Sequence, residues 1–81
     1  PVAARVVVDA GARRAVAEGG ASLLAVGVLA CEGAFAAGDA IELVGPDGEA
    51  FARGIVGADA SEVEARPRGL EVVHRDRLVL Y

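Results

Sequence analysis

The hydrophobic and polar positions of the chain fall into short blocks that predict a mainly β domain with short helices. Val6–Val8 is a β-branched run typical of a buried strand. Leu23–Leu29 is apolar apart from Gly27, where we expect this second strand to bend. Further strands are predicted over Ala40–Val44, Glu49–Val56, Leu70–Val73 and Leu78–Leu80.

Capping residues predict two helices between these strands. Asp9 stands at an N-cap position, where its carboxylate accepts from N–H groups of the first turn. The helix then covers Ala10–Glu18 and ends at Gly19-Gly20, because glycine adopts the left-handed conformation at little cost. Asp59-x-x-Glu62 resembles a capping box that opens a short helix ending near Arg66. The order is of the β-α-β-β-β-β-α-β type, which is typical of a small closed or nearly closed β structure.

Turn residues connect the strands. Gly45-Pro46-Asp47-Gly48 predicts a hairpin, since Pro presets the first central position and Gly accepts a positive φ at the exit. On the second arm of that hairpin, alternation predicts that Phe51, Arg53 and Ile55 face the same way. His74 and Asp76 are predicted to hold a turn between the last two strands.

The composition is that of one small domain with few large side chains. The chain has 81 residues, of which 54% are hydrophobic but only 4% aromatic. A chain of this size buries only about 60% of the surface that its unfolded form exposes, so it depends on a compact core or a partner. The lack of methionine and the start at Pro1 lead us to expect a fragment of a longer protein. Residues 1–81 would form a single domain within it.

Charge is unevenly distributed along the chain, whose formal net charge is −4. All eight basic residues are arginine. Residues 32–52 carry five acidic side chains and no basic one, so this stretch would repel phosphate, whereas the two ends are neutral to slightly basic.

The cysteine content and the lengths of the apolar runs bear on the compartment. Cys31 is the only cysteine and lies in an apolar stretch, where we expect a buried free thiol. Such a thiol suits a reducing, cytoplasmic environment. No apolar run approaches the length of a membrane-spanning helix, so no membrane contact is expected.

Motifs for nucleotide, metal and kinase chemistry are missing from the sequence. A phosphate-binding loop of the G-x-x-x-x-G-K-S type requires a lysine, and no G-x-G-x-x-G occurs. His74-Arg75-Asp76 matches the catalytic triplet of protein kinases, but Tyr81 stands where those enzymes need an asparagine. One histidine with one cysteine gives no metal-ligand spacing. We therefore expect no catalytic, cofactor or metal site in this chain.

The order and spacing of five short motifs resemble the PUA domain at the C-terminus of bacterial glutamate 5-kinases. The motifs are V-D-A-G-A at Val8–Ala12, S-L-L-A-V-G-V at Ser22–Val28, G-A-F-A-A-G-D at Gly33–Asp39, A-R-G at Ala52–Gly54 and E-V-V-H-R-D at Glu71–Asp76. The resemblance covers roughly residues 6–80 and implies a β pseudobarrel flanked by helices.

The same resemblance implies a non-catalytic accessory domain. The ATP- and Mg-dependent phosphorylation of L-glutamate, the first step of proline biosynthesis, would be carried out by an amino-acid-kinase domain of the same polypeptide. The parent protein would be a cytoplasmic homo-oligomer. This domain would regulate the enzyme by docking, for which we expect a surface that contains two aromatic and three acidic residues: Phe35, Phe51, Glu42, Asp47 and Glu49.

RNA binding is the alternative function. PUA domains of RNA-modifying enzymes use the first helix, the glycine-containing loop after it and the last strand as a surface that faces RNA. Carried over by position, that surface consists of Arg13, Arg14, Gly20, Ser22, Leu23, Gly27, Arg75 and Arg77. Arginine binds phosphate in a bidentate manner, and glycine lets a backbone approach closely. The acidic net charge and the shortage of aromatic side chains for base stacking speak against RNA.

Overall fold

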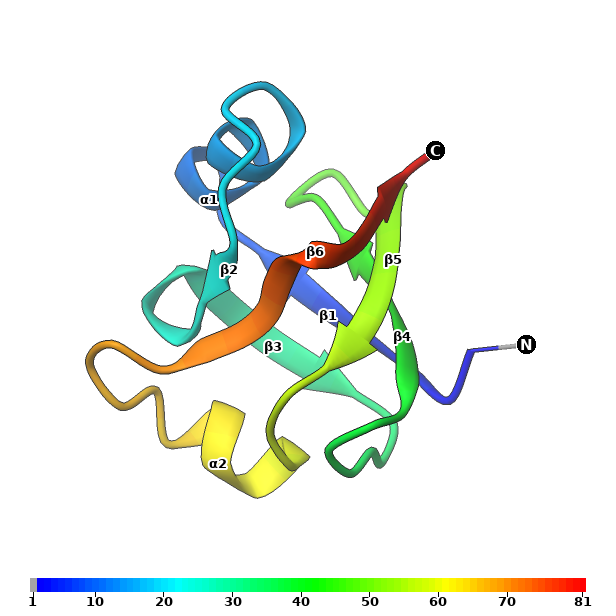
Figure 1. The fold of residues 1–81 in the computed structure, drawn as a ribbon, viewed down its shortest axis with the longest axis vertical. Helices are drawn as coiled ribbons and strands as arrows, with labels where there is room; N and C mark the ends of the chain where they lie inside the picture. The colour runs from blue at the N-terminus through cyan, green and yellow to red at the C-terminus, as the bar shows by residue number, and fades with distance from the viewer. Residues whose placement is uncertain (1) are drawn as a thin grey trace.

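The computed structural model describes residues 2–81 and confirms a mainly β fold with short helices (Figure 1). The strands are β1 (Ala4–Val8), β2 (Leu23–Leu24), β3 (Val28–Glu32), β4 (Ala40–Val44), β5 (Ala50–Val56) and β6 (Glu71–Leu80). The helical elements are α1 (Ala10–Ala17), the 3₁₀ turn η1 (Ala25–Gly27) and α2 (Ala60–Glu64). The predicted β-α-β-β-β-β-α-β order is therefore confirmed, whereas the strands predicted over Leu23–Leu29 and over Leu70–Leu80 are divided differently from the prediction.

One six-stranded sheet curls on itself to form the body of the domain. Its strand order is β2-β6-β5-β4-β1-β3, so β2 and β3 are the two edge strands. Only the three residues of η1 join them, so the Cα atoms of Leu24 and Val28 can lie at most about 14 Å apart. The edges of a flat six-stranded sheet would lie about 24 Å apart. The sheet must therefore bend until its edges approach, as Figure 1 shows, and the predicted pseudobarrel follows.

Small aliphatic side chains fill the space inside the curled sheet. The largest fully buried side chains come from β1, β2, β4, β5, α2 and β6: Val6, Val8, Leu23, Ile41, Leu43, Val44, Val56, Val63, Val72 and Val73. Phe35 and Phe51 also belong to this core, with 7% and 9% of their surface exposed. A core with so few large side chains uses both rings to fill its volume, which removes them from the predicted docking surface.

The predicted caps and the hairpin turn are confirmed. Asp9 Oδ1 accepts from the N–H of Ala12 at 2.7 Å at the start of α1, and Glu62 Oε1 accepts from the N–H of Asp59 at 3.0 Å at the start of α2. In the hairpin, the N–H of Gly48 donates to the carbonyl of the first turn residue at 2.9 Å. Gly48 has a φ of +86°, which suits glycine at the turn exit.

The segment predicted as a single strand over Leu23–Leu29 is two strands on opposite edges of the sheet. The chain leaves β2 after Leu24, turns through η1 and continues as β3. Gly27 occupies the turn, where a Cβ would lie only 2.5 Å from the Cβ of Ala12. The bend expected at this glycine is therefore the point at which the chain crosses from one sheet edge to the other against α1.

β-Bulges modify two further predictions. No turn separates two strands at His74 and Asp76, since β6 is unbroken in the described chain, but residues 74–77 form a bulge where its register against β5 shifts. His74 and Asp76 hold this bulge together, because the N–H of Asp76 donates to His74 Nδ1 at 3.0 Å. The expected alternation fails at Phe51, because the β4–β5 register shifts next to it. The bulge turns Phe51 into the core, whereas Arg53 stays exposed.

Arg66 covers the free edge of β3. Its Nε donates to the carbonyl of Val28 and its Nη2 to the carbonyl of Leu29, both at 2.6 Å. Successive carbonyls of a regular strand point in opposite directions, but the β1–β3 register shifts here, so that one guanidinium meets both. The side chain thereby satisfies two acceptors at an edge that has no further strand beside it.

We expect Arg66→Gln to lower the free energy of unfolding by about 1–2 kcal/mol, because a charge-assisted pair of hydrogen bonds is lost at a partly exposed site. Arg68→Gln is the matched control, since Arg68 is exposed and forms no side-chain hydrogen bond in the described chain. Urea unfolding monitored by circular dichroism compares the two variants. Equal midpoints for both variants would contradict a role of Arg66 at the β3 edge.

Candidate functional site

A groove of about 300 Å³ lies between α1 and the segment that leads into η1. The residues that line it come from the start of α1, one side of that helix, and the loop with η1: Asp9, Gly11, Ala12, Ala15, Ala21, Ser22, Leu24, Val26 and Gly27. This is the glycine-containing region for which the sequence predicts binding.

Short backbone contacts fix the floor of the groove. The N–H of Asp9 donates to the carbonyl of Gly27 at 2.9 Å, while the Asp9 carboxylate caps α1. Gly27 sits so close to Ala12 that no side chain fits between η1 and the helix. The helix and η1 therefore form one rigid unit at the base of the groove.

Ser22 ties the groove to the bulge of β6. Its Oγ accepts from the backbone N–H of Arg75 at 2.9 Å, and the next residue, Leu23, pairs with Val73 of the same strand. Arg75 therefore lies beside the groove without lining it. The predicted association of the glycine loop with the last strand is present in the structure.

The rim of the groove is apolar. Leu24 and Val26 line it, with 42% and 60% of their surface exposed, and Leu29 on the adjoining strand is 51% exposed. Asp9 is the only charged residue of the lining, and its Oδ1 already accepts a hydrogen bond. Exposed aliphatic side chains around a hollow are typical of a surface that binds another apolar surface.

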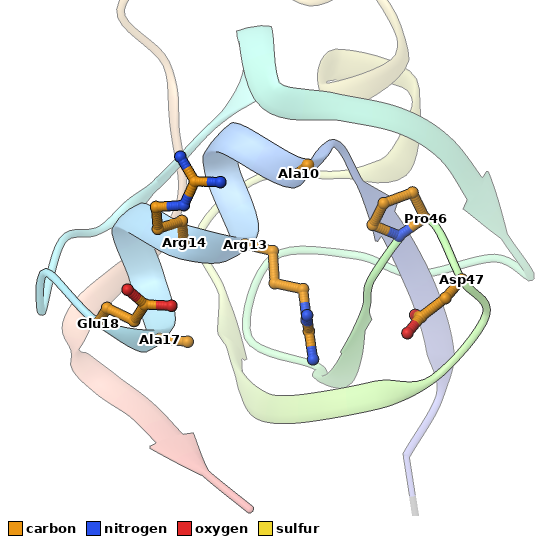
Figure 2. A pocket seen from close by; sticks show the side chains of 7 residues that line it. All are labelled: Ala10, Arg13, Arg14, Ala17, Glu18, Pro46 and Asp47. Atoms are coloured by element: carbon orange, nitrogen blue, oxygen red, sulfur yellow. The ribbon is translucent and has the colours of Figure 1, made fainter.

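The predicted RNA-facing residues do not converge on one surface. Ser22 and Gly27 line the groove, whereas Arg13 and Arg14 line a different cleft, between α1 and the β4–β5 hairpin (Figure 2). Arg77 lines a third hollow of about 250 Å³, together with residues of β5.

Gly20 and Leu23 are the two remaining residues of this set. Gly20 has a φ of +64° and lies in open space just after α1. Leu23 is only 1% exposed, so its place on a binding surface is wrong: alternation along β2 turns Leu23 into the core and Leu24 outward. That alternation is the signal in the sequence that could have identified Leu24 as the surface residue.

The acidic residues of the predicted docking surface serve local contacts. Glu42 accepts from the Tyr81 hydroxyl at 2.6 Å, and this hydrogen bond raises the pKa of the Tyr81 phenol. Arg5 Nε lies 3.8 Å from the same carboxylate. Asp47 Oδ1 accepts from the backbone N–H of Glu49 at 3.0 Å within the hairpin turn.

Other chemical groups are sparse in the described chain. Cys31 is a free thiol that is half-buried rather than buried; burial and the charge of Glu64 raise its pKa, which Arg66 lowers to a smaller extent. Over residues 2–81, no three His, Cys, Asp or Glu side chains are placed to hold a metal ion. The same residues include no helix with the length and apolar character needed to cross a membrane.

Comparison with protein families identifies this architecture. The model of the PUA domain family matches residues 4–77, from β1 to the bulge of β6. This chain belongs to the PUA domain family. The resemblance carried by the five sequence motifs is thereby confirmed, and the groove between α1 and η1 lies within the matched region.

Glutamate 5-kinases contain relatives of this PUA domain. It is 42% identical over 93 residues to the glutamate 5-kinase of Methylobacillus flagellatus, a match that covers 98% of this chain and 25% of that protein. The glutamate 5-kinase of Sphingopyxis alaskensis is 45% identical over 91 residues, which cover 94% of this chain and 24% of that protein. The PUA domain thus spans about a quarter of the length of these relatives.

Solved structures share the fold. A PUA domain protein (APE0525) of Aeropyrum pernix K1, solved as a tartrate complex, has a TM-score of 0.78 at 31% identity, over 89% of this chain and 41% of that one. NSun6 of Pyrococcus horikoshii, solved with SFG, has a TM-score of 0.77 at 33% identity, over 89% of this chain and 18% of that one. The archaeal box H/ACA sRNP Nop10–Cbf5 complex matches with a TM-score of 0.78 at 24% identity.

We expect Gly27→Ala to lower the free energy of unfolding by about 1–3 kcal/mol, because the new methyl group overpacks the contact with Ala12. The double variant Gly27→Ala/Ala12→Gly restores the space, although glycine within a helix costs about 1 kcal/mol. Urea unfolding of the wild type, both single variants and the double variant gives the coupling energy. Strictly additive changes would contradict direct contact between η1 and α1.

Proposed function

We propose that this PUA domain is a non-catalytic accessory domain of a glutamate 5-kinase and acts by docking on another part of the same polypeptide. The observation that carries this proposal is its 42% identity, over 98% of its length, to one quarter of such an enzyme. The remaining chain would include an amino-acid-kinase domain that binds ATP and Mg and phosphorylates L-glutamate for proline biosynthesis. The parent enzyme would act as a cytoplasmic homo-oligomer.

The groove is the docking surface in this proposal. Its rim exposes Leu24 and Val26, and covering such side chains stabilises a contact by roughly 25 cal/mol for each Å² of apolar surface removed from water. No arginine lines the groove, so the groove suits an apolar protein surface better than a phosphate backbone. The rigid floor formed by Asp9 and Gly27 supports docking without rearrangement.

Kinetics of the natural polypeptide that carries this domain test the proposal. We expect removal of the domain to leave glutamate-dependent ADP formation in place but to change its inhibition by proline or the assembly state. Leu24→Ser/Val26→Ser should reproduce that change, because it removes the apolar rim. Val79→Ser is the matched control, since Val79 is 59% exposed but does not line the groove.

The outcomes separate the two parts of the proposal. A polypeptide without glutamate-dependent kinase activity would overturn the assignment to a glutamate 5-kinase. Full activity and unchanged regulation in Leu24→Ser/Val26→Ser, together with a clear effect of domain removal, would leave the enzyme class in place but exclude the groove as the docking surface.

RNA binding is a second candidate, favoured by the bulge of β6. His74, Arg75 and Arg77 are all exposed there, and Ser22 of the groove contacts the backbone of this segment. Docking as the main role predicts only weak, non-specific RNA binding, with a Kd of about 10⁻⁴ M or weaker at physiological salt.

Filter binding of a structured RNA at several salt concentrations measures this alternative. Tight binding, with a log Kd–log salt slope that becomes shallower by about 2 in Arg75→Gln/Arg77→Gln, would make RNA the partner and contradict docking as the main role. Arg68→Gln is the control, because Arg68 is exposed in the loop before β6 and lines neither the groove nor the hollow that contains Arg77.

A further inference from the structure

A second cleft, of about 310 Å³, lies between α1 and the β4–β5 hairpin (Figure 2). Side chains of both elements line it: Ala10, Arg13, Arg14, Ala17, Glu18, Pro46 and Asp47. Its volume is at the lower end of the range of about 300–1,000 Å³ that is typical of small-molecule sites. The size suits a ligand with few atoms.

Arg13 is held in a fixed position in this cleft. Its Cζ lies 5.4 Å from the centroid of the Phe51 ring, so that the guanidinium is placed over a buried aromatic face. Gly45 provides the room, because a Cβ at that residue would lie 2.8 Å from Arg13 Cδ. Figure 2 shows Arg13 extending into the space between α1 and the hairpin turn, while Arg14 extends in another direction.

The guanidinium of Arg13 has hydrogen-bonding capacity that the described chain does not use. Its Nε is buried and has no hydrogen-bond partner among residues 2–81. A buried donor without a partner costs about 1–3 kcal/mol, and native structures contain few of them. The planar fork of a guanidinium fits a carboxylate in a bidentate manner. The Nε itself is closed off from a ligand, but the two Nη groups are not buried and form no hydrogen bond with residues 2–81, so they can donate to an anionic group in the cleft.

The charges of the cleft select the kind of anion. Glu18 and Asp47 line the cleft together with Arg13 and Arg14, so the lining includes two carboxylates as well as two arginines, of which only Arg13 extends toward the hairpin. A phosphate with two negative charges, or a nucleic acid backbone, would be repelled by these carboxylates. A zwitterion would instead find a partner for each of its charges.

The spacing of opposite charges fits such a zwitterion. A Cβ on Gly45 would lie 3.1 Å from Arg13 Nε and 3.0 Å from Asp47 Oδ1, so these two atoms are within about 6 Å of each other. The side chain of Asp47 is oriented by a hydrogen bond that its Oδ1 accepts from the backbone N–H of Glu49. A carboxylate and an ammonium group on the same carbon atom can contact both side chains at once.

We propose that this cleft binds a small zwitterion of the α-amino-acid class. Its carboxylate pairs with Arg13, and its ammonium group lies at Asp47 of the hairpin. Glu18, at the end of α1, adds a second negative charge to the lining. This inference concerns residues of the domain itself and holds whether or not the parent protein is a glutamate 5-kinase.

Nuclear magnetic resonance on the 81-residue chain tests it, because the side-chain Nε–H of Arg13 gives its own signal. The probes are L-alanine, propionate, which keeps only the carboxylate, and isopropylammonium, which keeps only the amine. We expect a saturable shift with L-alanine and a Kd of about 1–10 mM, as befits a ligand with few atoms. Propionate should bind at least about fivefold more weakly, and isopropylammonium should leave the signal unmoved.

Three variants make the result specific to this cleft. Arg13→Lys keeps the charge but not the fork and should weaken L-alanine binding at least about fivefold. Asp47→Asn should weaken L-alanine but not propionate. Arg68→Gln, the matched control, should change the Kd less than about twofold, because Arg68 is exposed and does not line the cleft. Backbone signals of each variant report whether it is folded.

The proposal is overturned by any of three results. The first is no saturable shift of Arg13 Nε–H with L-alanine up to about 100 mM, well above the expected Kd. The second is equal affinity for L-alanine and propionate, which would leave Asp47 without a role. The third is a loss of binding in Arg68→Gln as large as that in Arg13→Lys.

Discussion

The three-residue link between β2 and β3 is the constraint on which the rest of this PUA domain depends. Because η1 joins the two edges of the sheet, the sheet must curl, and one small core then lies inside it. The same link presses η1 against α1, where only glycine fits at Gly27. The groove between these elements is therefore a direct consequence of sheet closure. Arg66 completes the closure of the sheet, because its guanidinium covers the outer edge of β3, where no further strand pairs.

The small core has consequences for the surface. With few large side chains available, Phe35 and Phe51 are both drawn inside, and exposed aliphatic residues rather than aromatic ones mark the groove. Phe51 then lies beneath Arg13, so one ring contributes to the core and also orients a cation at the surface. The apolar groove and the charged cleft lie on different sides of α1, which separates their chemistry.

Local features of this fold could be predicted from the sequence, because neighbouring residues determine them. The cap at Asp9, the capping box at Asp59 and the hairpin turn at Gly48 are of this kind. The crossing of the chain at Gly27 could not be predicted, since it depends on the distant contact with Ala12. Bulges at Phe51 and in β6 likewise arise from register between strands.

The candidate site was predictable only in part for the same reason. The glycine loop and Ser22 lie at the groove as expected, but adjacent helix residues point about 100° apart, so Arg13 leaves the face that Ala12 occupies.

Amide hydrogen exchange, compared between the isolated domain and the natural polypeptide that carries it, tests the docking role most directly. Docking through the groove predicts slower exchange over residues 21–28 in the polypeptide and unchanged exchange in the hairpin. Equal exchange over residues 21–28 in both would contradict it.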